Sequence, residues 1–594
     1  MIFKKDFYRN VFVVVAALFV LAAARVESYA SDSVPIQGRT ELGEQGSGAD
    51  SNKAASSLWR SYIWENFPDD VLKGSEPDPV SEAYQQNDWK PIFISGQFHL
   101  SREGKLFWEC LHSLEDQAID STPYKLDELA RSIESLEHDL MALKGIDPDP
   151  RDTTAEALAN PIDTSAASHT GSKPGMDGAP ASPPPVSPQE RLEKYHQTFQ
   201  AAGELDVRLV SAFVRYAKEM NPFCGADLTE ALAGRTPIPR FLKDLEPASG
   251  DYENLVSTYI RYKKLSAGGR QTYVASAPLR PGESGNNIRD LQKRLQQEDF
   301  YSGTITGIYD SETQHAVKQF QIAHQIDPDG AVGQRTRDWL NVSFREKAEM
   351  VAYSMKGMRQ SKTRTANRFI RINIPQFLLE YYKDGNIQET HRIVVGKAGG
   401  KRVKFRGRMV GENQTPTLTS SIEQIILNPR WYVSDRIRLE LDSEAKSDPS
   451  YFTRHGYVQM SSLHAWGEPR IFQMPGPKNA LGRVKFEFPN VYAVYLHDTP
   501  LKQLFQRSRR DFSHGCIRVD KAINLAETLL KDDNSTYVQK INSIVETDHQ
   551  VFVKLAQPVP ISIEYLPVFP NGKGQVVFLG DPYGLLTDTV NRKG

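Results

Sequence analysis

Two residues in this chain, Cys516 and His497, have the types and spacing that acyl-transfer chemistry requires. Cys516 lies in the segment Ser-His-Gly-Cys-Ile-Arg at 513–518, nineteen positions after His497. A thiol is only weakly ionised near neutral pH, and a nearby imidazole can hold it as the thiolate that attacks a carbonyl carbon. Gly515 allows a sharp turn, which lets consecutive backbone N–H groups face a developing oxyanion. The pattern predicts acyl transfer through a thioester.

Two further interpretations of these residues remain open on residue types alone. A free cysteine is ordinarily a small buried side chain, and a lone histidine is more often structural than catalytic. His497, His514 and Cys516 also offer the nitrogen and sulfur ligands that zinc prefers. Against zinc, no second cysteine lies near and no Cys-x-x-Cys pair occurs. We therefore expect no metal ion and no other cofactor.

The region that must position these residues, 366–556, is predicted to be a mostly β domain. Apolar runs predict strands at 368–374, 377–382, 390–395, 422–427, 484–488, 492–496 and 551–555. Residues 522–530 predict a short amphipathic helix. Mixed helical, loop and aromatic signals over 435–481 predict an insertion, and residues 557–594 predict further strands, at 561–565 and 576–579, and a tail.

The first thirty residues indicate export. Lys4, Lys5 and Arg9 precede the apolar run Val11–Ala24, and Ser28–Ala30 offers small residues for cleavage. This layout is typical of a signal peptide at 1–30, since the run is short for a span of about 20 residues. An uncleaved anchor is the alternative, and it would be the only membrane contact. The formal charge of −2 gives no drive towards nucleic acid.

The N-terminal half predicts a scaffold without chemistry of its own. Residues 31–57 predict a flexible leader, and 58–277 a helical domain interrupted by a disordered Pro/Ser-rich insertion at 146–188. Leucines and one isoleucine at steps of three and four predict a helix over 126–143, and a second helix runs from 191 towards 220. Cys110 and Cys224 allow a disulfide without requiring one.

Residues 278–342 predict a compact unit of three short helices. The first covers 288–295, the second follows Asp310 as N-cap, and the third runs from 333 to 340. The motif Gly-x-Tyr-Asp-x-x-Thr-x-x-Ala-Val-x-x-Phe-Gln at 307–321, followed by Asp-Gly-x-Val-Gly-x-x-Thr at 329–336, resembles the three-helix peptidoglycan-binding domain. This resemblance implies binding to the bacterial cell wall.

A second resemblance covers the region of the cysteine. His497 followed by Ser-His-Gly-Cys-Ile-Arg at 513–518 resembles the signature of the L,D-transpeptidase catalytic domain. The segments 479–486 and 495–500 resemble the large multidomain branch of that family. The fold class this implies is α+β and multidomain. It comprises a mostly β catalytic domain with a lid-like insertion, the peptidoglycan-binding domain and a helical N-terminal scaffold.

Carried over residue by residue, the resemblance makes Cys516 the nucleophile and His497 its general base, later the general acid. Backbone N–H groups of His514, Gly515 and Cys516 are the expected oxyanion hole. The His514 side chain is expected to orient the loop or touch the substrate. A backbone carbonyl near Asp498 or the hydroxyl of Ser513 is expected to orient the His497 ring.

Three further residues are candidate substrate contacts: Arg518, Ser513 and Trp431. Arg518 stands where the family often has a polar residue such as asparagine. It is expected either to hold a substrate carboxylate bidentately or to pair with an acid such as Asp520. Trp431 either walls the groove or lies in the core. The insertion around Tyr451 to Met474, with Trp466 and Phe472, is the candidate lid.

The reaction implied by the resemblance has peptidoglycan tetrapeptide stems as substrates. Cys516 attacks the L,D-peptide bond before the terminal D-alanine, and an amine of a second stem resolves the thioester to give a 3→3 cross-link. Water as acceptor would make the protein an L,D-carboxypeptidase. A cysteine endopeptidase of wall peptides and a non-catalytic wall-binding scaffold also remain open. The resemblance further implies covalent inhibition by carbapenems and a periplasmic location.

Overall fold

The computed structural model describes two compact units of the chain. It covers Trp59, Ile63 and residues 79–87, 89–144, 187–247, 250–269, 271–275, 277–361, 366–399, 401–405, 408–460, 470–571 and 574–586. The first unit ends at Glu246 and the second follows from Pro247, with residues 116–118 joining the second. The predicted signal peptide and leader lie outside the described residues, as does the predicted insertion up to residue 186.

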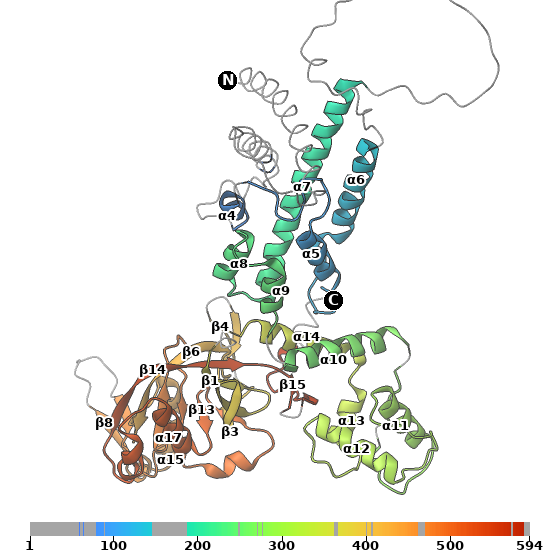
Figure 1. Cartoon of the computed structure of the whole chain (residues 1–594). Helices are drawn as coiled ribbons and strands as arrows, with labels where there is room; N and C mark the ends of the chain where they lie inside the picture. The colour runs from blue at the N-terminus through green and yellow to red at the C-terminus, as the bar shows by residue number, and fades with distance from the viewer. Residues whose placement is uncertain are drawn as a thin grey trace, which may run out of the picture. The chain divides into compact units, whose positions relative to one another are not determined.

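The first unit is helical, as predicted. Its helices are α4 (Pro79–Gln86), α5 (Arg102–His112), α6 (Leu126–Lys144), α7 (Pro188–Met220), α8 (Gly225–Leu232) and α9 (Ile238–Leu245). The leucine spacing corresponds to α6, which lies beside α7 (Figure 1). Helix α7 begins at Pro188, three residues before the predicted start, because Ser187 and Glu190 form a capping box. The predicted insertion therefore extends one residue too far.

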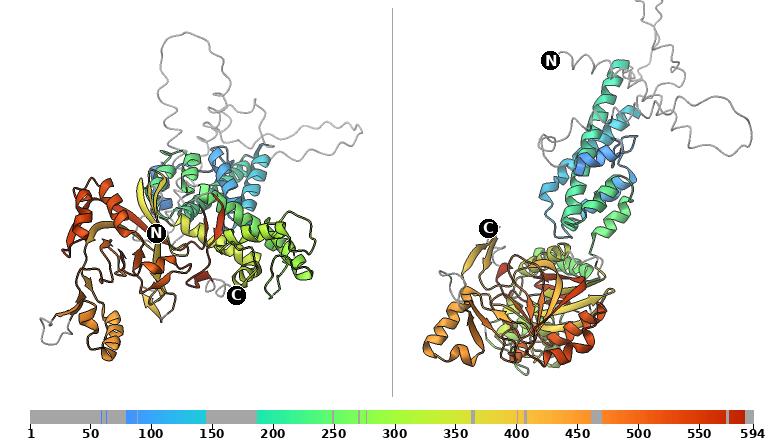
Figure 2. Two further views of the ribbon diagram at one scale, coloured as in Figure 1. Left: turned by 90° about the horizontal axis from the view of Figure 1, so that it is seen from below. Right: turned by 90° about the vertical axis from the view of Figure 1, so that its left-hand side faces the viewer.

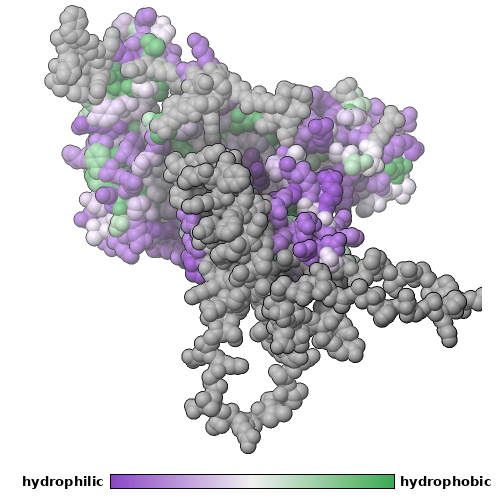
Figure 3. Space-filling view, turned by 90° about the horizontal axis from the view of Figure 1, so that it is seen from above, coloured by the Kyte–Doolittle hydropathy of each residue, from purple (hydrophilic) through white to green (hydrophobic). Residues whose placement is uncertain are grey.

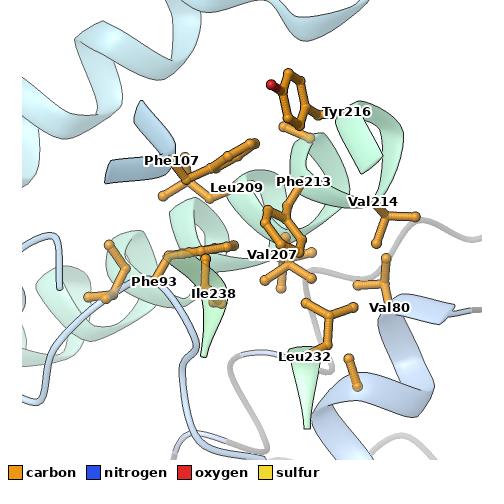
Figure 4. Close-up of a cluster of buried hydrophobic side chains, with 14 of the residues drawn as sticks. Val80, Phe93, Phe107, Val207, Leu209, Phe213, Val214, Tyr216, Leu232 and Ile238 are labelled. Carbon is orange, nitrogen blue, oxygen red and sulfur yellow. The ribbon is translucent and has the colours of Figure 1, made fainter. Parts of the chain in front are cut away.

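Aromatic side chains fill the core of this unit. The rings of Phe93, Phe107 and Phe213 contact one another, with centroids 5.1–5.3 Å apart (Figure 4). All three are fully buried, so they contribute much of the apolar surface that holds α5 against α7. Cys110 is half-buried and Cys224 is buried, and no disulfide joins them.

A buried carboxylate on α7 holds the backbone at residues 93 and 94 in place beside this core. Asp206 accepts the Tyr84 hydroxyl at 2.6 Å and the N–H groups of Phe93 and Ile94 at 2.7 and 2.9 Å. Burial raises the pKa of Asp206, and these hydrogen bonds oppose the rise. No periodic signal marks this residue in the sequence, since an acid in the middle of a helix is ordinarily exposed.

The second unit contains the predicted three-helix domain. Its helices are α11 (Asn286–Gln297), α12 (Ser311–Ala323) and α13 (Gln334–Asn341). Asp310 is the N-cap of α12, as predicted, and its Oδ1 accepts the Thr313 N–H at 2.8 Å. Gln321 ties α12 to the following turn by donating to the Asp329 carboxylate at 2.8 Å and accepting from Gly330 N–H at 2.9 Å.

Two long helices pack next to this domain. These are α10 (Gly250–Ala267) and α14 (Phe344–Arg359), which share a core with the strand β15 (Val568–Pro570). The helical scaffold predicted over 58–277 therefore divides at residue 246, because α10 buries its apolar face in the second unit. Helix α14 was not predicted, although a capping box at Ser343 and Glu346 marks its start.

A buried charged cluster joins α14 to the three-helix domain. Glu298 accepts from Lys347 at 2.5 Å and from Arg294 at 2.8 Å, and the Tyr262 hydroxyl donates to it at 2.7 Å. Burial lowers the pKa of Lys347 to about 8, against the attraction of Glu298. The His324 ring stacks on Phe320 of α12, with ring centroids 3.9 Å apart.

The catalytic region is a sheet that closes on itself. Its strands run in the order β12-β3-β13-β11-β10-β6-β14-β1-β2, and β2 also pairs with β3. Their bounds are β1 (Arg368–Asn373), β2 (Leu378–Lys383), β3 (Asn386–Gly396), β6 (Leu418–Leu427), β10 (Val484–Glu487), β11 (Leu496–His497), β12 (Asp511–Ser513), β13 (Ile517–Val519) and β14 (Val551–Glu564). The helices α17 (Ala522–Asp532) and α18 (Ile541–Val545) contribute to its core.

The sheet differs from the prediction in several places, and the strands β12 and β13 on either side of Cys516 were not predicted. The strand predicted over 492–496 is confined to β11, because the Asn490 side chain bonds Tyr492 N–H and Val494 carbonyl in a turn. Strand β14 is continuous through a bulge between Lys554 and Val559, where two strands were expected. A hairpin of β4 (Arg402–Phe405) and β5 (Arg408–Gly411) was not predicted. A last strand, β16 (Val576–Phe578), pairs with β15.

The predicted insertion carries its own small sheet. It contains α15 (Asp435–Ser447), α16 (Tyr451–Arg454), β8 (Tyr457–Met460) and β9 (Arg470–Gln473), and β9 pairs with β8 and with β7 (Trp431–Tyr432). Both views of Figure 2 show this region, in orange, standing off the main sheet. Trp466 lies outside the described residues.

The described surface is mainly hydrophilic in the view of Figure 3, with scattered apolar residues. Among the described residues, no helix combines the length and the apolar character needed to cross a bilayer.

Candidate active site

Cys516 lies in the turn between β12 and β13. Gly515 before it has φ +116°, a backbone conformation that side-chain-bearing residues rarely adopt. The backbone N–H and the hydroxyl of Tyr495 both hydrogen-bond the Cys516 sulfur. The sharp turn predicted from Gly515 is therefore present.

Strand pairing places His497 beside Arg518, two residues after Cys516. Strands β11 and β13 are parallel, with Leu496 opposite Ile517 and His497 opposite Arg518. Because alternate residues share a face, His497 and Arg518 lie on the face opposite to the buried pair. Tyr495 connects the two candidate catalytic groups: its hydroxyl bonds the thiol, and its ring centroid is 5.7 Å from that of His497.

The backbone carbonyl of Asp498 orients the His497 ring, one of the two possibilities left open by the sequence. The distance from Nδ1 to this oxygen is 2.5 Å, so Nδ1 carries the proton and Nε2 is left as the basic nitrogen. Burial, with the nearby charges of Arg518 and Lys485, lowers the pKa of His497 to about 3. The imidazole is therefore neutral in the resting protein.

Asp498 is itself fixed by its side chain. Its Oδ2 accepts the Arg483 N–H at 2.9 Å, and Lys502 forms an ion pair with the carboxylate. Gly482 has φ +60°, and a Cβ there would overlap the Asp498 carboxyl group. Glycine at 482 thus allows the close approach that anchors the carbonyl holding His497.

The thiol is also neutral at rest. Burial raises the pKa of Cys516, while hydrogen bonds from Tyr495 and the charges of Lys485 and Arg518 oppose the rise. The directions of these two pKa shifts favour a neutral thiol and a neutral imidazole, because burial disfavours both ions.

The Ser513 side chain stabilises the turn at residues 513–517, which carries Cys516 and is called here the nucleophile turn. Its hydroxyl donates to the Cys516 carbonyl at 2.6 Å and accepts the Gly515 N–H at 3.1 Å, and the residue is buried. Ser513 was expected to be a substrate contact, but both of these bonds lie within the turn. The Gly515 N–H therefore already donates a hydrogen bond to the Ser513 hydroxyl. In the described part of the chain the Cys516 N–H donates to no protein acceptor, so it is available to an oxyanion.

A second set of hydrogen bonds, which includes Tyr583 of the C-terminal segment, stabilises the same turn. The Thr415 hydroxyl donates to the Gly515 carbonyl at 2.8 Å and accepts the Gly396 N–H at 2.9 Å. The Tyr583 hydroxyl donates to the Gly396 carbonyl at 2.8 Å and accepts the Thr415 N–H at 3.1 Å. No sequence motif indicated this network, because it joins four separated parts of the chain.

The guanidinium group of Arg518 is in a position to bind an anionic group of a substrate. It is half-buried on β13, and no ion pair of its guanidinium is found among the described residues, Asp520 included. Its Nε is buried without a hydrogen-bond acceptor. These contacts favour the substrate-carboxylate interpretation over the pairing with Asp520.

Trp431 and Lys485 complete the polar environment. Trp431 is half-buried in β7 and hydrogen-bonds the Tyr495 side chain, so it lies beside the site. Lys485, which no sequence motif indicated, lies opposite His497 on β10, and its Nζ is 4.3 Å from the centroid of the Tyr495 ring. Only strand register reveals this lysine as part of the site.

His514 faces the insertion. Its Nε2 lies 3.1 Å from a carboxylate oxygen of Glu440 on α15. The turn that carries Cys516 and helix α15 of the insertion are therefore in direct contact. Phe472 of the lid is buried, and Tyr451 packs on Tyr457 with ring centroids 6.4 Å apart. No group of three or more metal-ligating side chains occurs in the described ranges.

Comparison with known proteins agrees with this geometry. Residues 367–553 match the family described as "L,D-transpeptidase catalytic domain", and 284–340 match the "Putative peptidoglycan binding domain". A Haemophilus influenzae protein named "Putative L,D-transpeptidase" is 31% identical over 230 residues, which cover 36% of this chain and 44% of that protein. The chain thus spans less than half of this relative's length.

Other matches are shorter or more distant. The spore cortex-lytic enzyme of Bacillus subtilis is 33% identical over 86 residues, covering 14% of this chain and 26% of that enzyme. The solved L,D-transpeptidase of Xylanimonas cellulosilytica is 17% identical with a TM-score of 0.17, covering 50% of this chain and 98% of that one. The assignment rests on the family matches and not on this structural likeness. Residues 367–553 thus match an L,D-transpeptidase catalytic domain and residues 284–340 a peptidoglycan-binding domain, within an α+β multidomain fold, as predicted.

Proposed function

We propose that this protein forms 3→3 cross-links in peptidoglycan through a thioester on Cys516. The observation that supports the proposal is the parallel pairing of β11 with β13, which puts His497 opposite Arg518, two residues after Cys516, in a region that matches the L,D-transpeptidase catalytic domain. Peptidoglycan stems are the substrate class that both matched domains favour. Such a substrate lies outside the cytoplasm, and we propose the periplasm as the location.

The first half-reaction acylates the enzyme. As the Cys516 sulfur attacks the carbonyl carbon of the diamino acid, His497 Nε2 takes the thiol proton. The Cys516 N–H faces the oxyanion. His497 then gives its proton to the departing nitrogen, the C–N bond breaks, and D-alanine leaves. Arg518 holds a carboxylate of this donor stem, which explains why its Nε meets no acceptor among the described residues.

The second half-reaction transfers the acyl group. A neutral amine of a second stem attacks the thioester, His497 removes one N–H proton and passes it to the sulfur, and the C–S bond breaks. Water in place of the amine would give hydrolysis, so excluding water decides the product. The Glu440–His514 contact supports the insertion as the lid. A carbapenem would acylate Cys516 by the same first step.

Product analysis tests this function. The full chain is incubated with purified tetrapeptide muropeptides, and the products are separated and weighed by mass spectrometry. The wild type and the matched control Cys110→Ala should give 3→3 dimers and D-alanine, whereas Cys516→Ala should give neither. Tripeptide without dimer would make the protein an L,D-carboxypeptidase. The same dimer yield from Cys516→Ala as from the wild type would refute Cys516 as the nucleophile, and no product from either protein would leave a wall-binding scaffold.

A further inference from the structure

The three-helix domain meets the rest of the second unit through the buried charged cluster. Its members come from separate elements, since Tyr262 belongs to α10, Arg294 and Glu298 to α11 and its C-cap, and Lys347 to α14. The side chains of Arg294, Glu298 and Lys347 have no exposed surface. Charged groups that water does not reach therefore hold this interface.

His324, the C-cap of α12, adds a titratable ring to the cluster. Its Nδ1 lies 2.7 Å from the backbone carbonyl oxygen of Phe320, so Nδ1 carries the proton. Its Nε2 lies 3.2 Å from Lys347 Nζ. Because an ammonium group can only donate, Nε2 must accept from it, and the docked imidazole is neutral.

Aromatic rings from both sides of the interface contact this imidazole. It stacks on Phe320 of the three-helix domain and on Phe578 of β16, with ring centroids 3.9 and 5.3 Å away. The ring of Trp339 on α13 lies 4.9 Å from it. His324 is only 2% exposed, so a charge placed on this ring is screened by neither water nor salt.

The charges around His324 leave no acid to compensate a protonated ring. The titratable and charged groups are, by element, Arg294, Glu298 and Asp299 at the end of α11, Arg261 and Tyr262 on α10, and Lys347 on α14. Arg261 and Asp299 pair with each other at 2.8 Å. Glu298 is then shared by Arg294 and Lys347, so this set already has three cations for two carboxylates. A further charge at Nε2 would lie 3.2 Å from Lys347 Nζ, where repulsion is strong.

Protonation of His324 therefore opposes docking. Burial, with the charges of Lys347 and Arg294, holds the pKa of His324 well below its ordinary value. When the interface opens, water surrounds the ring and its pKa returns to about 6.5. The released state then binds a proton that the docked state does not, so docking weakens as the pH falls below about 6.5, by up to ten-fold for each pH unit. The pKa of Lys347, lowered to about 8, affects docking only at alkaline pH.

We propose that the buried charged cluster is an acid-sensitive joint, in which protonation of His324 releases the three-helix domain from α10, α14 and β16. The released domain stays covalently attached to the chain, so acid frees it to move independently of the catalytic sheet. The inference does not depend on the proposed reaction, and its test needs no substrate.

Pulsed electron spin resonance between two nitroxide labels measures docking in the full chain. The labels are attached at His315→Cys on α12 and Asn524→Cys on α17, both exposed, in a Cys110→Ala/Cys224→Ala/Cys516→Ala background. This parent chain should give one narrow distance distribution at pH 7.5. At pH 5.0, which is 1.5 pH units below the ordinary pKa, linkage weakens docking by about 30-fold. The released population should therefore grow at least ten-fold, while circular dichroism shows unchanged helix content.

Two substitutions in the parent chain identify the group that titrates. His324→Gln keeps a hydrogen-bond acceptor but cannot be protonated, so it should stay docked at pH 5.0. The exposed His549→Gln is the matched control and should release its domain as the parent chain does.

Three results would overturn the inference: a parent chain that stays docked at pH 5.0, release that is accompanied by loss of helix, or equal release in His324→Gln. If His324→Gln does not dock at pH 7.5, nuclear magnetic resonance of the ¹³C-histidine-labelled chain decides. The His324 signal, identified by its absence in the variant, should be that of a neutral ring in the docked chain at pH 5.0 and of a protonated ring in the released chain. A protonated His324 in the docked chain would overturn the joint.

Discussion

The Nδ1 atom of His497 lies 2.5 Å from the backbone carbonyl oxygen of Asp498, the next residue in the chain. A carbonyl cannot accept a proton from the imidazole, so it orients the ring and fixes its tautomer without adding a charge. In this site the charges that act on the imidazole are positive ones, from Arg518 and Lys485. They favour a base that is neutral before the reaction begins.

The anchoring of Asp498 can be tested at Gly482. In Gly482→Ala the new Cβ overlaps the Asp498 carboxyl group, which displaces the carbonyl that orients His497. We expect turnover to fall at least ten-fold and the free energy of unfolding to fall by about 1–3 kcal/mol. Steady-state kinetics and chemical denaturation measure the two effects.

Gly385→Ala is the matched control, because Gly385 also has a positive φ but open space around its Cβ position. It should lose about 1 kcal/mol of stability and keep its turnover. Equal turnover in the two variants would contradict the role given to Asp498.

The resting charge state predicts how thiol reactivity depends on pH. The pKa of Cys516 lies above its ordinary value and that of His497 is about 3, so both groups are neutral between pH 5 and 8. Raising the pH ionises the thiol, so the iodoacetamide rate should rise continuously and inflect only above about 8.5. The measurement uses a Cys110→Ala/Cys224→Ala background. A rate plateau at pH 5–7 would instead reveal a thiolate–imidazolium pair.

The network behind the nucleophile turn can be tested at Thr415. Thr415→Val keeps the shape of the side chain but removes the hydroxyl between Gly396 and Gly515. We expect a loss of about 1–3 kcal/mol in stability, because buried backbone groups lose a partner. We also expect a three- to ten-fold fall in turnover, because the turn that presents Cys516 loosens. Thr415→Ser should restore both quantities, and failure of this rescue would count against the network.

The contact between the insertion and the nucleophile turn can be tested at Glu440. If α15 shields the thioester, Glu440→Gln should weaken its hold on His514 and raise the share of acyl-enzyme lost to water two- to five-fold. Glu444→Gln, one turn further along α15, is the control and should behave like the wild type. The ratio of tripeptide to dimer gives the answer. An unchanged ratio in Glu440→Gln would remove the support for shielding.

Local sequence signals predicted much of the fold. Asp310 as an N-cap and the leucine spacing of α6 act within a few residues, so the sequence displays them directly. The prediction of α7 missed only its first turn, where Ser187 and Glu190 form the cap. Helix α14 was not predicted despite the same kind of cap, because its buried face includes Lys347 and Arg359, which interrupt the apolar pattern.

The sequence indicated the candidate reactive residues but not the side chains that surround them. Cys516 and His497 stand in recognisable motifs, whereas Lys485 and Thr415 come close through strand pairing and side-chain contacts across the sheet. Such register cannot be derived from one sequence, because a shift of one residue moves every side chain to the other face. The hydrogen bonds of Ser513 within the turn were not predicted, because they depend on the folded conformation of the turn.

The mass of Cys516 after a single encounter with a tetrapeptide stem tests the central claim most directly. After rapid mixing and acid quenching, the peptide that contains Cys516 should gain the mass of the stem without its terminal D-alanine, and free D-alanine should appear in equal amount. A peptide of unchanged mass in a protein that still releases D-alanine, or an adduct at any residue other than Cys516, would contradict the thioester mechanism.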